Sequence, residues 1–516
     1  ITKTMGQLTP TLILAVISGY FLLLITVSFI TSKGASDNAN FFIGSKQSPW
    51  YVVAFGMIGA SLSGVTFISI PGTVGLSHTF IIADGILQYN KNVNFSYMQM
   101  VFGYLIGYVM IATILLPMYY RLNLTSIYTY LEKRFGFFSY KTGAGFFLLS
   151  RVIGASFRLY LVALVLDAFV LGVEPFNVPF EITVIATIVL IWVYTFRGGI
   201  KTIVWTDSLQ TFCMLAAVVL TIWGIGNAMD LSVRSLVSTV QESDYSQLFF
   251  FEDGWSDPNN FFKQFLAGAS IAFVMTGLDQ DMMQKNLSCR NIGDAQKNMI
   301  SLGVVLIFVN ILFLGLGALL YIYANSQGIV IPEKTDELFP MIALEHLSPA
   351  VGILFILGLI AAAYSSADSA LTSLTTSFCV DFLNFEKKED ANNRENRRTR
   401  TIVHISFSIL LIMVIIIFKN LDDSSVINKV FTAAGYTYGP LLGLYIFGFF
   451  TKFKINDKLA PFICIASPII CYVLSLYSTT LFYGYKFGFE LLILNGLITF
   501  LGLLAISNGK IKGQVV

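Results

Sequence analysis

The chain has 516 residues, of which 55% are hydrophobic and only 12% are charged, with a formal net charge of +2. Soluble domains carry about 25% charged residues, so a soluble protein of this length is excluded. The small, dispersed charge gives no support to nucleic-acid binding. The sequence contains no phosphate-binding loop, zinc-protease helix or nucleophile elbow, so we expect neither an ATP-driven pump nor an enzyme.

Apolar runs in chain order predict a polytopic helical membrane protein. The runs are roughly 20 residues long, the length that crosses a bilayer, and they lack the alternation of a transmembrane barrel. We expect thirteen transmembrane helices, at about 8–32, 49–76, 96–120, 142–172, 180–196, 203–226, 260–284, 298–324, 340–383, 401–418, 424–450, 459–477 and 487–506. Three polar segments stand out: 77–95 as an insertion, 227–259 with a short lid helix, and 386–400 as a solvated linker.

Basic residues predict the orientation of the chain. Lysines and arginines gather in the loops after odd-numbered spans, for example at Arg121 and Lys133 after the third span and at Lys285 after the seventh. Loops on the other side are acidic, as in 242–258. Because cytoplasmic loops carry the excess of Lys and Arg, we expect a multi-pass protein of the inner cell membrane, with its N-terminus outside and its C-terminus cytoplasmic.

The stretch AAAYSSADSALTSLTT (361–376) places seven serines and threonines and an aspartate inside an apolar run. On a helix, one face of this stretch carries Ala362, Ser365, Ser366, Ser369, Ser373 and Thr376. Close packing between helices explains one such hydroxyl. The pair of serines followed by Asp368 favours a cation site, because hard cations take oxygen ligands and membrane aspartates are usually functional.

Two spans are interrupted by residues that weaken a helix. GMIGASLSGVTFISIPG (56–72) predicts an unwound stretch around 59–64, whose free carbonyl groups would bind a cation. VMTGLDQDMMQK (274–285) contains Thr276, Gly277, Asp279 and Asp281 within an apolar run. Two broken spans that lie five spans apart in the chain are typical of an inverted repeat whose binding site lies at the midplane of the membrane. Close packing between helices would also explain the glycines.

Two arginines, Arg151 and Arg158, lie deep in one span. A buried arginine in a membrane pairs with a carboxylate, which belongs either to the protein or to an anionic ligand. The candidate carboxylates of the protein are Asp207, Asp279 and Asp368.

These segments resemble the sodium:solute symporter family. The similar stretches are YYRLNLTSIYTYLEKRFG (119–136), FRGGIKTIVWTDSLQ (196–210), DQDMMQKNL (279–287) and AAAYSSADSALTSLTTSFCVDF (361–382). The resemblance implies an all-α membrane protein with the leucine-transporter-type fold, built from a 5+5 inverted repeat. It also implies a domain order: a leading helix and loop at 1–48, the first repeat at 49–226, an extracellular loop at 227–259, the second repeat at 260–450, and two further helices at 451–516.

The resemblance also implies sodium coupling, with Na⁺ as the transported ion. The family's common sodium site corresponds to backbone oxygens of Gly59, Leu62 and Ala362 and the hydroxyl groups of Ser365 and Ser366. A second sodium site, present in some members, corresponds to Asp207, Asp368 and Ser369 and shares Ser365. Asp368 stands where these members have a serine. Two carboxylates near one ion would bind Na⁺ more tightly, or one would stay protonated, so involvement of a proton stays open.

The solute is predicted from a narrower resemblance within the family. Sialic-acid transporters place hydroxyl groups on the first core helix and an arginine on the third, and the similar residues here are Ser61, Ser63, Thr66 and Arg158, with Arg151 as the rival arginine. Thr276, in the second broken span, is a further candidate. An arginine facing a carboxylate makes chemical sense because its planar fork binds both oxygens.

We therefore expect a Na⁺-driven symporter of a small solute, sialic acid or another acidic sugar or carboxylate, that works by alternating access as a monomer in a lipid bilayer. The alternatives are a Na⁺-coupled symporter of a neutral sugar or polyol, a proton-coupled carrier, or a uniporter of the same fold.

Overall fold

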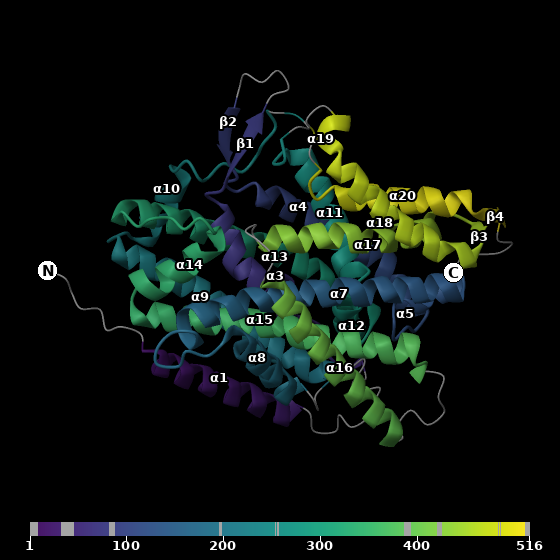
Figure 1. Ribbon diagram of the computed structural model, residues 1–516, viewed down its shortest axis with the longest axis horizontal. Coiled ribbons are helices and arrows are strands. Elements are labelled where there is room, and N and C mark those ends of the chain that lie inside the picture. The colour runs from purple at the N-terminus through teal and green to yellow at the C-terminus, as the bar shows by residue number, and fades with distance from the viewer. Residues whose placement is uncertain are drawn as a thin grey trace.

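Long helices make up most of the chain because a backbone inside a bilayer must satisfy its own hydrogen bonds. The computed structural model describes residues 9–31, 46–81, 88–195, 199–252, 254, 257–385, 394–419, 426–482, 485 and 487–510. Its helices run mostly along the long axis of the molecule, with α1 at one side and α18 and α20 at the other (Figure 1).

The elements follow the predicted order closely. The first half contains α1 (Pro10–Thr31), α3 (Trp50–Thr73), α4 (Tyr97–Met110), α5 (Leu116–Arg121), α6 (Thr129–Arg134), α7 (Phe137–Leu166), α8 (Phe180–Thr195), α9 (Gly199–Ala228) and α10 (Val233–Gln241). The second half contains α11 (Phe261–Gly277), α12 (Gln280–Leu287), α13 (Ile292–Gln327), α14 (Leu338–Met341), α15 (Pro349–Ser377), α16 (Arg394–Phe418), α17 (Val426–Phe450), α18 (Ala460–Leu476), α19 (Ser478–Leu481) and α20 (Leu491–Ala505). Short π-helical turns extend α4, α7, α14 and α15.

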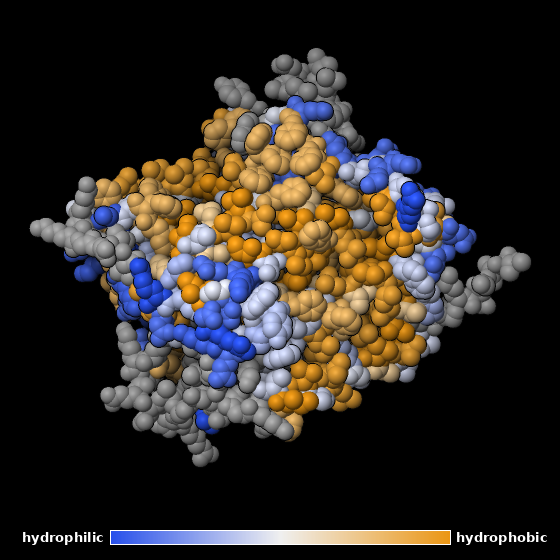
Figure 2. Space-filling model, turned by 180° about the vertical axis from the view of Figure 1, so that it is seen from behind, coloured by the Kyte–Doolittle hydropathy of each residue, from blue (hydrophilic) through white to orange (hydrophobic). Residues whose placement is uncertain are grey.

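In the described residues, nine helices are long and apolar enough to cross a membrane, and the bent pair of α11 and α12 adds a tenth. Two shorter apolar helices, Phe180–Val193 and Leu491–Ala505, have the same character. Large apolar side chains such as Phe308, Phe450 and Phe462 are about two-thirds exposed, as expected for a surface that faces lipid. Hydrophobic residues cover much of the face in Figure 2. The multi-pass helical class is thus confirmed, while the number thirteen stays a prediction.

Two small strand pairs and one short helix lie between the long helices. The insertion at 77–95 forms an antiparallel hairpin of β1 (Ser77–Ile81) and β2 (Gln88–Asn92), which was not predicted. A second small pair, β3 (Phe453–Ile455) and β4 (Ser507–Lys510), joins the ends of α17 and α20. A short helix expected within 227–259 is present as α10, whose N-terminus is capped by the Ser232 hydroxyl at 3.2 Å from the Ser235 amide nitrogen; its role as a lid stays a prediction.

Two predicted boundaries are wrong. The span expected at 340–383 is two elements, because Leu347 and Ser348 are extended before Pro349, which begins α15. The solvated linker expected at 386–400 is helical from Arg394 onward, since α16 begins there with good helix formers; the rest of that linker lies outside the described residues.

Both predicted helix breaks are present. In α3 the helix is interrupted at Ser63, whose φ of 43° and ψ of 171° lie outside the helical region. Between α11 and α12 the chain bends by 65°. The carboxylate of Asp279 caps the start of α12 by accepting hydrogen bonds from the amides of Asp281 (2.9 Å) and Met282 (3.3 Å). The two breaks lie within one buried core, in which α3 packs against α9, α13 and α15.

Candidate functional site

A cavity of about 90 Å³, here called the central cavity, lies at the two helix breaks. Its lining includes all six residues predicted to bind solute: Ser61, Ser63, Thr66, Arg151, Arg158 and Thr276. They come from three elements, α3, α7 and α11, which are far apart in the sequence. The structure therefore brings the predicted solute residues together around one space, and their binding role stays a prediction.

The break in α3 positions the hydroxyl groups of this cavity. Ser63 is a non-glycine residue with positive φ, a conformation that costs about 1–3 kcal/mol and occurs mostly at functional sites. Its side chain is nevertheless buried, at 3% exposure, and lines the central cavity together with Ser61 and Thr66. The interruption thus turns several side-chain oxygens of one helix toward the same space.

The two arginines of α7 have different surroundings. The guanidinium group of Arg151 pairs with the carboxylate of Asp281 and lies 3.9 Å from an oxygen of Asp279. Tyr438 donates a hydrogen bond of 2.5 Å to that same oxygen of Asp279. Of the candidate carboxylates, only Asp279 contributes to this cluster, and Asp281 was not among the candidates. Arg151 is therefore neutralised by the protein.

Arg158 lies seven residues further along, on the same face of α7. Its side chain lines the central cavity and has no ion pair or hydrogen bond with any residue that the structure describes, and its Nε is buried without a partner. The Arg158 side chain is partly buried. Desolvating a cation without a partner costs free energy, so we expect a ligand with a negative charge to pair with it. The structure favours Arg158 over its rival Arg151 as the group that is free to bind an anion.

Replacing Arg151 with glutamine is expected to destabilise the folded protein by about 3–5 kcal/mol, because two buried carboxylates lose their cation. The matched variant Arg158→Gln removes an arginine from the same helix face without breaking an ion pair, so its stability should change little. The melting temperature of each variant in detergent measures this difference. Equal losses in both variants would contradict the assignment of the ion pair to Arg151.

The central cavity also contains residues that sequence reasoning missed. Three tyrosines of α4, Tyr97, Tyr104 and Tyr108, line it, and the hydroxyl groups of the first two lie 3.0 Å apart. Asn310 of α13 and Tyr438 of α17 complete its polar lining. The spacings of seven and four residues place the α4 tyrosines on one helix face, so this signal was present in the sequence.

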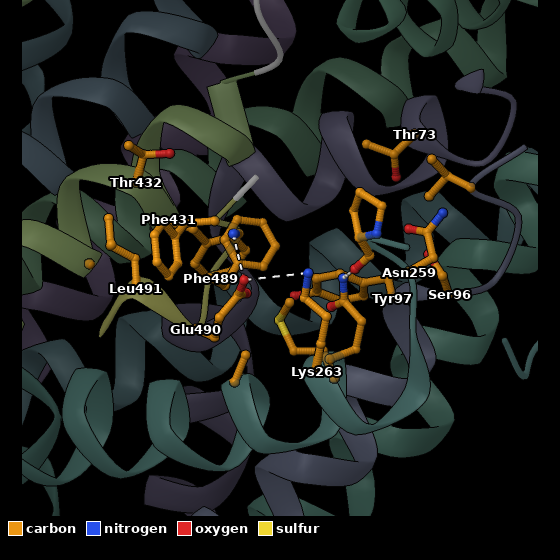
Figure 3. Close-up of a pocket in the computed structure, with 18 of the residues that line it drawn as sticks. Thr73, Ser96, Tyr97, Asn259, Lys263, Phe431, Thr432, Phe489, Glu490 and Leu491 are labelled. Carbon is orange, nitrogen blue, oxygen red and sulfur yellow. Dashed lines mark hydrogen bonds and ion pairs between the residues drawn. The ribbon is translucent and has the colours of Figure 1, made fainter. Parts of the chain in front are cut away.

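A second cavity of about 340 Å³, here called the vestibule, adjoins the central cavity and shares Tyr97 and Phe431 with it. Figure 3 shows Lys263 of α11 and Glu490, just before α20, facing each other across this space, with Phe489 and Phe431 beside them. The Lys263 Nζ lies 3.5 Å from the Glu490 carboxylate and 4.3 Å from the centre of the Tyr485 ring. The vestibule thus leads to the central cavity past two aromatic side chains.

The residues predicted for the first sodium site lie where the break in α3 meets α15. Gly59, Leu62, Ala362, Ser365 and Ser366 are all buried. The two helices approach closely, since a Cβ atom added at Gly64 would lie 3.7 Å from the backbone of Ala363. The structure therefore brings the two halves of this predicted site to one interface.

The hydroxyl groups of this interface fit a cation. The Ser366 Oγ is buried and has no hydrogen-bond partner in the part of the chain that the structure describes. Ser365 donates a hydrogen bond of 2.9 Å to Asp207, which leaves its oxygen lone pairs available. Oxygen atoms of this kind suit a hard cation such as Na⁺.

The residues predicted for a second sodium site are buried nearby, and the carboxylates of Asp207 and Asp368 already have partners. Asp207, from α9, accepts from Ser365 with one oxygen and lies 2.8 Å from the Lys285 Nζ with the other. The Asp368 carboxylate lies 2.5 Å from the Ser369 amide nitrogen, and the Ser369 hydroxyl has no partner among the described residues. Lys285 was predicted to be a cytoplasmic loop residue, and this is wrong: it lies in α12 with only 1% of its side chain exposed.

The chain matches the sodium:solute symporter family model over residues 41–460. It is similar to the sodium/sialic acid symporter NanT of Aliivibrio fischeri, with 27% identity over 81% of this chain and 78% of the relative. It is also similar to the sodium/sialic acid symporter SiaT of Proteus mirabilis, with 25% identity over 85% of this chain and 84% of the relative. A more distant relative is the human sodium/iodide cotransporter, which is 22% identical over 84% of this chain and 65% of the relative.

Solved structures show the same fold. A Na⁺-coupled sialic acid symporter in a substrate-bound, outward-open state has a TM-score of 0.77 and 20% identity, covering 96% of this chain and 97% of that one. A nucleobase-cation-symport-1 family transporter in a closed conformation has a TM-score of 0.50 and 14% identity, covering 91% and 94%. These likenesses confirm the leucine-transporter-type fold, while the predicted limits of its repeats stay predictions.

Proposed function

The chain belongs to the sodium:solute symporter family and is a membrane transporter that couples Na⁺ to solute uptake by alternating access; we propose that its solute is a carboxylate-bearing sugar of the sialic acid class. The observation that carries this proposal is the free guanidinium group of Arg158 in the central cavity. An arginine there would bind both oxygens of a solute carboxylate. Two relatives with this activity, NanT and SiaT, support the same solute class.

The rest of the central cavity suits a solute rich in hydroxyl groups. Ser61, Thr66, Thr276 and Asn310 offer hydrogen-bond donors and acceptors, and the α4 tyrosines add both polar and apolar surface. Sites for ligands of drug-like size usually enclose about 300–1,000 Å³, so the central cavity of about 90 Å³ holds only part of such a solute in this state. We place the carboxylate and ring in the central cavity and the polyol chain toward the vestibule, past Tyr97.

We propose that one Na⁺ binds between the break of α3 and α15. Its ligands would be the backbone oxygens of Gly59, Leu62 and Ala362 and the hydroxyl groups of Ser365 and Ser366. Such an ion would tie α15 to α3 and stabilise the state that binds solute. Its release on the other side would loosen that contact and allow the helices to separate.

The direction of transport follows from the Na⁺ gradient and the orientation that we propose. The N-terminus would lie outside and the C-terminus in the cytoplasm of a cell whose inner membrane holds the protein as a monomer. Each net positive charge that enters gains about 2.3 kcal/mol per 100 mV, whereas one Na⁺ that enters with a solute of one negative charge is driven by the concentration term alone.

The thermal stability of the purified protein in Na⁺ and in K⁺ tests the solute class. Ligands that bind only the folded state raise its melting temperature by mass action. We expect sialic acid to raise it in Na⁺ but not in K⁺, and neutral sugars and polyols to leave it unchanged. If a neutral sugar stabilises the protein in Na⁺ and sialic acid does not, the solute class is wrong. If sialic acid stabilises equally in K⁺, the coupling between solute and Na⁺ is wrong for this protein.

A further inference from the structure

Lys285 is a buried cation that is not among the residues proposed to bind the solute or the first sodium ion. It lies in the second helix of the broken pair, and its side chain is 1% exposed. Its Nζ is 2.8 Å from the Oδ2 of Asp207, a residue of α9 that is itself fully buried. Burying a lysine costs free energy unless a carboxylate neutralises it, so the Lys285 ammonium group depends on Asp207.

Both oxygens of Asp207 are occupied by this arrangement. The Oδ1 accepts the hydrogen bond of Ser365, and the Oδ2 faces the ammonium group of Lys285. A sodium ion bound to Asp207 would have to share this carboxylate with a fixed positive charge. At such short separations, and in an interior of low dielectric constant, like charges repel strongly. The ammonium group therefore already pairs with one oxygen of the carboxylate that was predicted to bind the second ion.

We propose that Lys285 acts as a tethered cation that takes the place of a second Na⁺. This symporter would then carry one Na⁺ per solute, an inference that rests on the proposed function. The ammonium group neutralises Asp207, and Asp207 in turn orients the Ser365 hydroxyl for the single ion at the first site. Because Lys285 is covalently attached, its charge does not leave with the solute. With a solute that carries one negative charge, one Na⁺ makes the transported pair electrically neutral.

The same lysine connects the sodium site to the solute cavity. Asp281, one turn before Lys285 on α12, lies 4.0 Å from the Lys285 Nζ and also pairs with Arg151 of the central cavity. A line of alternating charges thus runs from Arg151 through Asp281 and Lys285 to Asp207, which accepts the hydrogen bond of Ser365. Movement of α12 during transport would disturb both ends of this line together.

Equilibrium binding of ²²Na⁺ to the purified protein tests the tethered cation without needing a solute. The wild-type protein is expected to bind one ion at saturation. Lys285→Met should bind two, because the uncompensated Asp207 and the hydroxyl oxygens around it then present a site of net negative charge. The double variant Asp207→Asn with Lys285→Met should bind one again, since neither charge of the pair remains.

Lys285→Arg provides the matched control because it keeps the positive charge, and it should bind one ion. Two ions on the wild-type protein would overturn the inference, and so would one ion on a folded Lys285→Met variant. If Lys285→Met does not fold, the double variant Asp207→Asn with Lys285→Met still tests the inference. Two ions bound to that double variant would contradict the proposed role of the Lys285–Asp207 pair. These outcomes are independent of the solute test, whose failure would concern only the proposed solute.

Discussion

The Arg158→Gln variant is expected to lose at least about 30-fold in affinity for sialic acid while its binding of Na⁺ stays intact. Removing one partner of a buried, hydrogen-bonded charge pair costs about 2–5 kcal/mol, and 1.4 kcal/mol corresponds to a factor of ten. Arg158 has no partner among the described residues, so its loss leaves no protein charge uncompensated. The effect should therefore appear in binding and not in stability.

Isothermal titration with sialic acid, together with ²²Na⁺ binding, measures this prediction. Arg158→Lys keeps the charge but loses the planar fork, so it should bind more weakly than the wild-type protein and more tightly than Arg158→Gln. Normal sialic acid affinity in Arg158→Gln would remove Arg158 from the solute site. Loss of both sialic acid and Na⁺ binding would instead indicate a general disturbance of the core.

The second large effect is expected at Ser366. Ser366→Ala should raise the Na⁺ concentration that gives half-maximal uptake by about tenfold or more, because one of the few ligands of the ion is lost. The Ser366 hydroxyl has no partner among the described residues, so its removal breaks no internal hydrogen bond. Folding should be preserved, which separates loss of a ligand from loss of structure.

Ser373→Ala is the matched control for Ser366→Ala. It removes a buried hydroxyl group from the same face of α15, but that group donates to the backbone oxygen of Ala370 in its own helix. Its Na⁺ dependence should match that of the wild-type protein. An unchanged Na⁺ dependence in Ser366→Ala, or an equal shift in both variants, would contradict the proposed ligand role.

Local sequence patterns predicted the helix breaks, and the family resemblance predicted most of the residues of the candidate site. Glycine, serine and proline in 56–72 lower helix propensity, and the break indeed occurs at Ser63. The hydroxyl groups of 361–376 are buried on α15, as expected for oxygens that have a use inside a membrane. The six predicted solute residues share one cavity because the inverted-repeat fold brings the two broken spans together.

The partner of Arg151, the burial of Lys285 and the β1–β2 hairpin depend on tertiary structure and could not be predicted from local sequence patterns. The partner of Arg151 is mainly Asp281, because the 65° bend after α11 carries the start of α12 toward α7. The same bend buries Lys285, which hydropathy alone places at the end of a span and so in a loop. The hairpin of β1 and β2 lies within the insertion at 77–95 and depends on pairing between two short strands, neither of which has the alternation of apolar residues that predicts a strand.

The most direct test of the central claim is uptake of radiolabelled sialic acid by proteoliposomes with an imposed inward Na⁺ gradient. The account predicts that sialic acid accumulates above its external concentration, that a K⁺ gradient of the same size gives no accumulation, and that a Na⁺ ionophore abolishes it. Equal uptake in Na⁺ and K⁺, or uptake that stops at equilibrium, would contradict Na⁺-coupled symport of this solute.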